Sequence, residues 1–265
     1  MAPPPIRFDD GALYERGMAR WSQKVGRTFL EWMAAEPGLA WIDVGCGNGA
    51  FTELIAETAS ASRIDGVDPS AGQIEYARSR PGAGSARFEI GDALALPFDD
   101  DVFDIAVMAL VIFFVPDPAR GVQEMRRVVR PGGRVAAYAW DIPGGGFPMQ
   151  PLLEELRAEG LTPSLPPHAD VSRADALQSL WSACGLEHIQ QRSFTVERSF
   201  AGFDEFWASS TASGSVMATL GSRSPDELQD FKRRVRARLP AAGGDGRLTT
   251  SARANAIIGR KSARE

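Results

Sequence analysis

The stretch Trp41-Ile-Asp-Val-Gly-Cys-Gly-Asn-Gly-Ala50 places three glycines, Gly45, Gly47 and Gly49, directly after a short apolar run. Glycines between a strand and a helix let the main chain approach a ligand closely, and the N-terminus of the helix adds positive potential there. The G-x-G-x-G spacing differs from the G-x-G-x-x-G of dinucleotide-binding loops, because Ala50 stands where that pattern has its last glycine. The loop therefore predicts a ligand site whose chemistry other residues must decide.

Strands and helices alternate on both sides of this loop. We expect strands at 39–44, 63–67, 86–90, 102–108, 134–140, 187–195 and 247–259. We expect helices at 11–36, 50–59, 70–80, 120–129, 172–184, 204–217 and 225–239. Ser172 with Asp175 has the spacing of a capping box, and so does Ser224 with Glu227. The alternation predicts an α/β fold, a doubly wound and mostly parallel sheet with helices on both faces.

Acidic residues close three successive predicted strands. Asp43 lies two residues before Gly45, Asp68 ends the second strand, and Asp92 follows the third. The carboxyl ends of parallel strands form one rim of the sheet, where α/β proteins bind ligands. A carboxylate at Asp68 can accept both ribose hydroxyl protons, and one at Asp92 can accept from an exocyclic amine such as that of adenine. The three acids together predict an adenosine-containing ligand.

Four motifs resemble those of class I S-adenosylmethionine-dependent methyltransferases, in particular the small-molecule group that includes the ubiquinone and menaquinone methyltransferases. They are Asp-Val-Gly-Cys-Gly-Asn-Gly (43–49), Gly-Val-Asp-Pro-Ser (66–70), Gly-Asp-Ala-Leu-Ala-Leu-Pro-Phe (91–98) and Arg-Pro-Gly-Gly-Arg-Val (130–135). The resemblance runs from about residue 11 to 260. It implies S-adenosylmethionine as the cofactor and a Rossmann-like, seven-stranded sheet whose last strand, 247–259, is antiparallel.

The resemblance also implies roles for individual residues. Gly45 and Gly47 would border the methionine part of the cofactor, and Asp43 would support that site. Asp68 would hold the ribose, and Asp92 the adenine. The cofactor-binding residues expected on this basis are Tyr14, Asp43, Gly45, Cys46, Gly47, Asp68, Pro69, Gln73, Asp92, Ala93, Leu94 and Ala109.

We expect one methyltransferase domain over residues 1–265. Its parts are an N-terminal helical lid (1–36), a cofactor-binding core (37–140), strand six with a helical cap over the acceptor (141–246), and the last strand (247–260). Tyr14 is a candidate cofactor contact because the N-terminal segment covers the cofactor in this group. Trp140, Phe147 and Trp207 are candidate substrate contacts and suit an apolar or aromatic acceptor; packing in the core is the alternative for each.

The sequence departs from the group after strand four. Its members often have a segment like Leu-His-His-Val-Pro-Asp, whereas residues 112–117 are Ile-Phe-Phe-Val-Pro-Asp. Methyl transfer from a sulfonium is an in-line displacement that needs mainly alignment and exclusion of water. A general base is required only when the acceptor keeps its proton. We therefore assign no catalytic residue.

Composition narrows the remaining classes. A net charge of -5 and a pI near 5.3 argue against general nucleic-acid binding. The two cysteines, Cys46 and Cys184, and the two histidines, His168 and His188, have no metal-ligand spacing, so neither a disulfide framework nor a metal site is expected. We expect a cytoplasmic protein that spans no membrane, because no signal-peptide pattern or apolar run of about 20 residues occurs. The oligomeric state stays open.

Four functions remain under consideration. A small-molecule methyltransferase fits best, and a protein that binds S-adenosylmethionine without methyl transfer is the alternative that the missing histidine favours. The glycine spacing disfavours a nicotinamide-dependent oxidoreductase. The segment after strand four, Met108-Ala-Leu-Val, lacks the Asn/Asp-Pro-Pro-Tyr/Phe motif of RNA and protein methyltransferases. We expect the basic run 232–238 to be a solvated helix face and the acidic run 99–101 a solvated turn.

Overall fold

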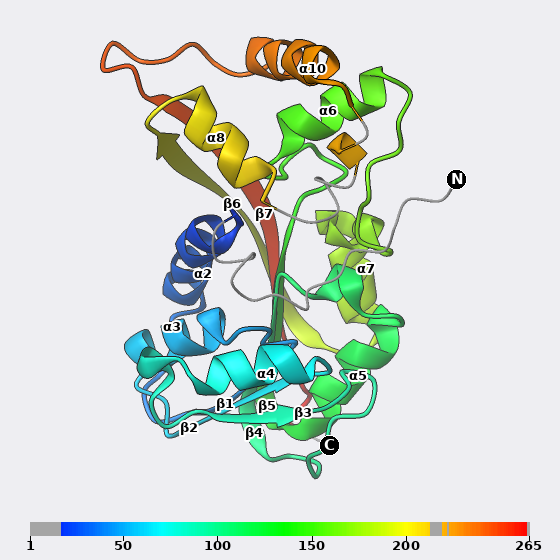
Figure 1. The fold of residues 1–265 in the computed structure, drawn as a ribbon. Helices are drawn as coiled ribbons and strands as arrows, with labels where there is room; N and C mark the ends of the chain where they lie inside the picture. Colours follow the sequence, from blue (N-terminus) through cyan, green and yellow to red (C-terminus); the bar gives the residue numbers. More distant parts are fainter. Residues whose placement is uncertain (1–16, 213–218, 222, 264–265) are drawn as a thin grey trace.

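The structure is a computed structural model that describes residues 17–212, 219–221 and 223–263. Seven strands form one sheet in the order β3-β2-β1-β4-β5-β7-β6 (Figure 1). Their bounds are Ala40–Val44 (β1), Arg63–Asp68 (β2), Arg87–Ile90 (β3), Phe103–Ala109 (β4), Val129–Trp140 (β5), Glu187–Phe200 (β6) and Leu248–Arg260 (β7). Strands β1 to β5 pair in parallel, and β7 runs antiparallel to both β5 and β6. The predicted fold class, with its antiparallel last strand, is confirmed.

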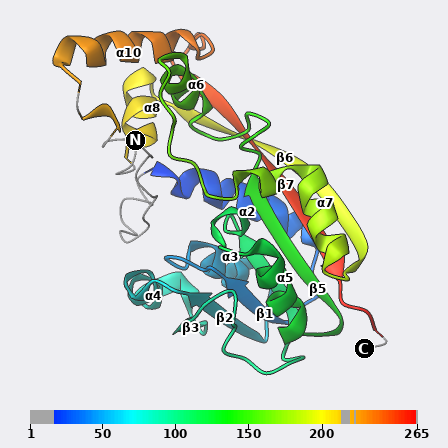
Figure 2. The same ribbon diagram turned by 90° about the vertical axis from the view of Figure 1, so that its right-hand side faces the viewer.

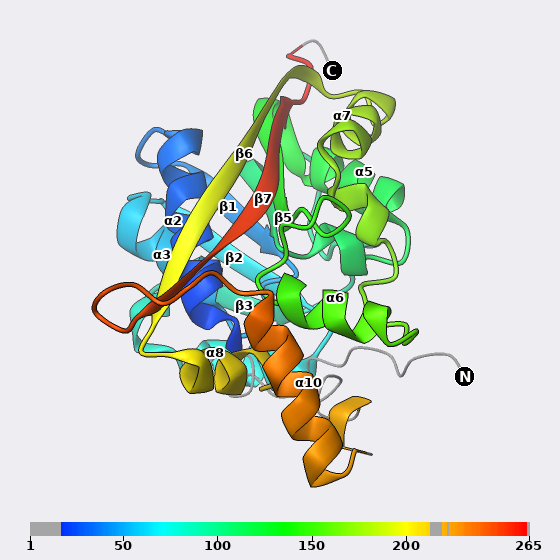
Figure 3. The same ribbon diagram turned by 90° about the horizontal axis from the view of Figure 1, so that it is seen from above.

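Helices cover both faces of this sheet. Their bounds are Ala19–Met33 (α2), Ala50–Thr58 (α3), Ala71–Arg78 (α4), Pro118–Val128 (α5), Gln150–Ala158 (α6), Ala174–Ala183 (α7), Phe203–Ser210 (α8) and Pro225–Ala237 (α10), with short 3-10 turns at Pro81–Ala83 (η1), Ile112–Phe114 (η2) and Ala169–Ser172 (η3). Helices α2 and α3 lie on one face, and α5 and α7 on the other (Figure 2 and Figure 3). None of the helices in the described ranges is long and apolar enough to cross a membrane.

The core surrounds the central strands. Strand β4 is buried at its first six positions, as expected for a parallel strand covered on both faces. Trp181 of α7 is fully buried and donates from Nε1 to the Val135 carbonyl of β5 at 3.0 Å, which fixes this helix on the sheet. Strand β5 begins five residues before the predicted Arg134, because Val129 already pairs with Phe103 ahead of an irregularity in the register.

Strands β6 and β7 continue beyond the rest of the sheet. Trp140, the last residue of β5, pairs with Ala254, whereas the β6–β7 pairing continues to Phe200 and Leu248. The prediction that strand six ends at Thr195 is therefore wrong, because β7 supplies pairing partners for five further residues. The two strands form a ribbon, and α6, α8 and α10 gather beside its far end (Figure 1).

Charged contacts attach α10 to α6. Glu155 of α6 is nearly buried and forms ion pairs with Arg234 and Arg238 of α10. Lys232 lies 5.2 Å from the centre of the Trp207 ring on α8. The prediction of a purely solvated basic face is thus wrong for these three cations, since acidic and aromatic groups of neighbouring helices face them.

Several predicted boundaries need correction. Ser172 does not cap a helix, because it ends η3 and donates its hydroxyl to the Ala169 carbonyl; α7 begins two residues later without a side-chain cap. The helix predicted to start at Asp204 ends at Ser210 as α8, and residues 213–218 lie outside the described ranges. The Ser224–Glu227 capping box is confirmed.

Two further expectations concern segments at the edge of the core. Asp100 pairs with Arg127 of α5, and Asp101 pairs with Lys261 after β7. The acidic turn is therefore bound to other segments of the protein and is not only solvated. The N-terminal helix is described from residue 17, and α2 ends at Met33 with Ala34 in a left-handed conformation. The first part of the predicted helix lies outside the described residues.

Candidate functional site

The glycine loop follows β1 and is hydrogen-bonded to the end of β2. Gly45, Gly47 and Gly49 have φ angles of 76°, 52° and 80°, in the left-handed region that disfavours residues with a Cβ atom. The N–H groups of Gly45 and Cys46 both donate to the Val67 carbonyl, at 2.7 and 3.0 Å. Helix α3 begins directly after Gly49, so its N-terminus faces this loop. The loop therefore combines a fixed main chain with positive potential.

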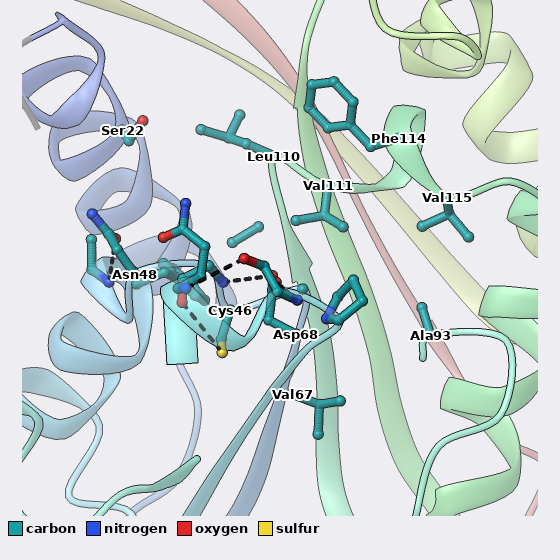
Figure 4. Close-up of a pocket in the computed structure, with 18 of the residues that line it drawn as sticks. Ser22, Cys46, Asn48, Val67, Asp68, Ala93, Leu110, Val111, Phe114 and Val115 are labelled. Atoms are coloured by element: carbon teal, nitrogen blue, oxygen red, sulfur yellow. Dashed lines mark hydrogen bonds between the residues drawn. The ribbon is translucent and has the colours of Figure 1, made fainter. Parts of the chain in front are cut away.

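Asp68 fastens the loop to the end of β2. Its carboxylate accepts the Gly47 N–H at 3.0 Å and the Ser70 N–H at 2.9 Å. Burial raises the pKa of Asp68, and these two hydrogen bonds oppose that rise. Figure 4 shows this side chain in the middle of the pocket. A carboxylate held in this way has defined oxygen positions for hydroxyl donors of a ligand.

Asp43 lies inside the core. Its side chain is fully buried and accepts the Thr52 hydroxyl of α3 at 2.7 Å. The Oδ1 atom has no hydrogen-bond partner within the described structure. Burial raises the pKa of Asp43 to about 7, the Thr52 hydroxyl opposes the rise, and the charge of Asp68 adds to it. Burial thus favours the protonated form of this carboxyl group.

A cavity of about 490 Å³ opens over the glycine loop, at the carboxyl ends of β1, β2 and β4. The predicted residues that line it are Gly45, Cys46, Gly47, Asp68, Pro69, Gln73, Asp92, Ala93 and Ala109. The structure therefore brings the glycine loop and two of the three predicted acids to one cavity. Burial raises the pKa of the Cys46 thiol, which keeps it protonated at neutral pH.

The other predicted residues lie elsewhere. Asp43 and Leu94 do not line the cavity, and Tyr14 lies outside the described residues. Trp140 is buried at the end of β5. Trp207 of α8 packs against Phe203 of the same helix and Phe231 of α10. The side chains named as candidate substrate contacts, Trp140, Phe147 and Trp207, do not line this cavity.

The cavity also has walls that sequence reasoning missed. They include Ser22 and Gln23 from α2, Asn48, Phe51 and Leu54 around the start of α3, Leu110, Val111, Phe114, Val115 and Pro116 after β4, and Tyr138 from β5. Ser22 and Asn48 lie on one side of the pocket, and Phe114 and Val115 on the other (Figure 4). The segment after β4 could have been predicted from the rule that ligands bind at carboxyl ends of parallel strands. Nothing local in the sequence marks Ser22 or Tyr138 as wall residues.

Leu110 has a φ of 62°, which is rare for a residue with a bulky side chain. Its N–H donates to the Tyr138 carbonyl at 2.8 Å. The next residue, Val111, packs against Gly45 so closely that a Cβ atom there would lie 2.4 Å from Cγ1 of the valine. The wall after β4 and the glycine loop therefore fit each other only while residue 45 is glycine.

The sheet order, the glycine loop and the acid after β2 define the class I S-adenosylmethionine-dependent methyltransferase fold. Residues 42–137 match the family described as methyltransferase domain. An uncharacterized protein from Mycobacterium bovis is 30% identical over 58% of this chain and 59% of its own length. The demethylmenaquinone methyltransferase of Desulfitobacterium hafniense is 34% identical over 44% of this chain and 47% of its own length. The chain therefore contains a methyltransferase domain, and its resemblance to the quinone methyltransferases is confirmed.

A solved structure agrees on the fold. The S-adenosylmethionine-dependent methyltransferase of Thermotoga maritima, described as a possible histamine N-methyltransferase, superposes with a TM-score of 0.58 at 20% identity. The match covers 94% of each chain. The alignments with the two sequence relatives span only about half to three fifths of those proteins. No group of three or more potential metal ligands occurs among the residues that the structure describes.

A matched pair of substitutions tests the glycine loop. Gly47→Ala should lower the free energy of unfolding by about 1 kcal/mol, because its positive φ is strained while open space surrounds the new methyl group. Gly45→Ala should cost roughly 2–4 kcal/mol, because the methyl group also overlaps Val111. Urea unfolding of the two variants measures the difference. Equal losses would contradict the close contact with Val111.

The pH dependence of stability tests the environment of Asp43. Its folded pKa of about 7 exceeds the unfolded value of 3.8, so the protonated form stabilises the protein. This contribution is complete below pH 3.8 and is lost as the pH rises through 7. Between pH 5 and 8, wild type should lose on the order of 2 kcal/mol relative to Asp43→Asn. Urea unfolding at both pH values measures this, and identical pH profiles would show that Asp43 titrates normally.

Proposed function

We propose that the protein transfers a methyl group from S-adenosylmethionine to a small apolar or aromatic molecule. The observation that carries this proposal is the cavity in which the glycine loop and Asp68 meet at the carboxyl ends of β1 and β2. Its volume of about 490 Å³ lies within the range of small-molecule sites. S-adenosylmethionine, when bound, supplies a methyl group activated by the sulfonium.

The residues present fit this cofactor. The Asp68 carboxylate would accept the ribose hydroxyls, and the Asp92 carboxylate with the Ala93 N–H would bind the adenine edge. The main chain at Gly45 and Gly47 would border the methionine part. The lining is completed by Cys46, Pro69, Gln73 and Ala109. Asp43 would support the loop from the core, and Leu94 would contact the cofactor next to Ala93. The close packing of Val111 on Gly45 supports a cradle in which a side chain has no room.

The wall after β4 supports an apolar acceptor. Leu110, Val111, Phe114 and Val115 line the cavity together, and Phe114 occupies one of the two positions where the related group often has histidine. Within the described lining no histidine occurs, so the lining residues would align the acceptor and exclude water rather than supply an imidazole base. The acceptor must therefore present a nucleophile that is reactive without such a base.

The alternative is a protein of the same fold that binds S-adenosylmethionine without transferring its methyl group. Phe114 favours it, since this apolar side chain lines the cavity where the related group often has histidine. A fold alone does not decide between an enzyme and a binding protein. Formation of S-adenosylhomocysteine on incubation with a panel of phenols and hydroquinones supports the enzyme. Binding without turnover for every acceptor in the panel supports the alternative.

Calorimetric titration with S-adenosylmethionine, S-adenosylhomocysteine and NADH tests the cofactor assignment. Wild type should bind the first two, and Asp68→Asn should weaken binding roughly 10- to 100-fold through loss of charge-assisted hydrogen bonds to the ribose. Asp65→Asn is the matched control. Asp65 also belongs to β2 and is buried, but it pairs with Arg63 and does not line the cavity. Binding of NADH alone would overturn the proposal.

A further inference from the structure

The segment after β3 presents Asp92 and Ala93 to the cavity as a tight turn. The Asp92 carboxylate accepts the Leu94 N–H at 2.9 Å, and the Asp92 carbonyl accepts the Ala95 N–H at 3.0 Å. Asp92 itself is exposed, and Ala93 is only half-buried. The position of its carboxylate therefore depends on where the main chain of the turn, including the Leu94 N–H, is held.

Three charged side chains of α5 hold the main chain after Asp92. We call Arg120, Glu124 and Arg127 the α5 clamp. Glu124 accepts the Leu96 N–H at 2.9 Å, and Arg120 donates to the Leu94 carbonyl at 3.1 Å. The clamp thus contacts the main chain on the carboxyl side of the turn.

Arg127 extends these contacts along the same segment. It donates to the Leu96 carbonyl at 3.0 Å and to the Phe98 carbonyl at 2.7 Å. Its guanidinium also donates to Glu124 at 2.8 and 3.0 Å. Residues 94 to 98 are therefore fastened to α5 at alternate positions by groups that are bonded to one another.

Glu124 is the centre of the clamp. Its side chain is 4% exposed and pairs with both Arg127 and Arg120. Hydrogen bonds from Arg127 hold the pKa of Glu124 below its usual value, so the carboxylate stays charged at neutral pH. A charge buried this deeply becomes costly when its partners move, which keeps all three side chains in one arrangement.

We propose that the α5 clamp positions the Asp92 carboxylate for recognition of the adenine amino group, which makes Glu124, Arg127 and Arg120 positioning residues for the cofactor. The inference rests on the proposed function. Its physical basis is that the clamp bonds to the main chain of the adenine-facing segment and contacts no part of the cavity itself. Recognition of a single amino group depends on a carboxylate oxygen placed within hydrogen-bond reach.

The chain offers a matched control for Glu124. Glu155 of α6 has a side chain that is 5% exposed and pairs with two arginines, Arg234 and Arg238. It neither lines the cavity nor contacts residues 92–98. Glu124→Gln and Glu155→Gln therefore remove equivalent buried charges, and only the first lies behind the adenine-facing segment.

The test compares S-adenosylhomocysteine with S-inosylhomocysteine, which has a carbonyl oxygen where adenine has its amino group. Calorimetry should show that wild type prefers S-adenosylhomocysteine. Glu124→Gln should weaken binding of this ligand about tenfold and leave S-inosylhomocysteine nearly unaffected, so that the preference shrinks. Glu155→Gln should keep the wild-type preference even if it lowers stability. General destabilisation of the protein would weaken the binding of both ligands by the same factor.

Arg120→Gln provides a second variant in case Glu124→Gln fails to fold. The Arg120 side chain is 52% exposed, so its loss leaves the core intact while removing the bond to the Leu94 carbonyl and the ion pair with Glu124. We expect about a threefold loss of preference from these two interactions. An unchanged preference in both variants, or an equal loss in Glu155→Gln, overturns the inference.

The failure of the proposed function gives a different result. Wild-type protein that binds neither ligand contradicts the cofactor assignment and the inference with it. Wild-type protein that binds both ligands equally leaves the cofactor assignment in place and overturns the adenine role of Asp92, and thereby the clamp. If the preference of the wild type is unchanged in Glu124→Gln and Arg120→Gln, only the positioning role of the α5 clamp is overturned.

Discussion

The site depends on a turn that only glycine accommodates at its tightest point. At Gly45 the main chain adopts a positive φ and passes directly against Val111. This path directs two consecutive N–H groups to the Val67 carbonyl and brings the Gly47 N–H to Asp68. The ends of β1, β2 and β4 are thereby held in contact. The cavity exists where it does because these three strand ends meet there.

The two walls of the cavity differ in their physical origin. The wall around Asp68 consists of strand ends and tight turns, whose main chain is fixed by hydrogen bonds within the sheet. The wall that faces Ser22 and Asn48 across the pocket consists of apolar side chains after β4, such as Phe114 and Val115 (Figure 4). Apolar contacts are not directional, so the part of this wall around Phe114 can change its shape, whereas Val111 is confined by its contact with Gly45. Under the proposed function, different acceptors would be accommodated by changes around Phe114 while the glycine loop stays the same.

Networks of arginine and glutamate hold together segments that the sheet does not hold. Glu124 connects α5 to the segment after β3, and Glu155 connects α6 to α10. In both cases a nearly buried carboxylate is shared by two arginines, whose planar guanidinium groups can donate several hydrogen bonds at once. The first network holds the segment after β3, and the second joins two helices that lie beside the ribbon of β6 and β7 (Figure 1). The same chemistry thus serves two different parts of the fold.

The order of strands and helices along the chain, the glycine loop and the acids at strand ends could be predicted from the sequence, because each of these has a local pattern. Periodicity and glycine spacing report on neighbours in the chain, and the parallel sheet then brings Asp68 and Asp92 to one rim. Which further side chains reach the cavity could be seen only in the folded structure. Trp140 is an aromatic residue at the end of a strand, as expected for a pocket, but it lies in the core. Ser22 reaches the wall from α2, which is distant from the strand ends along the chain. Membership of a wall depends on how remote segments pack, and no local pattern encodes that packing.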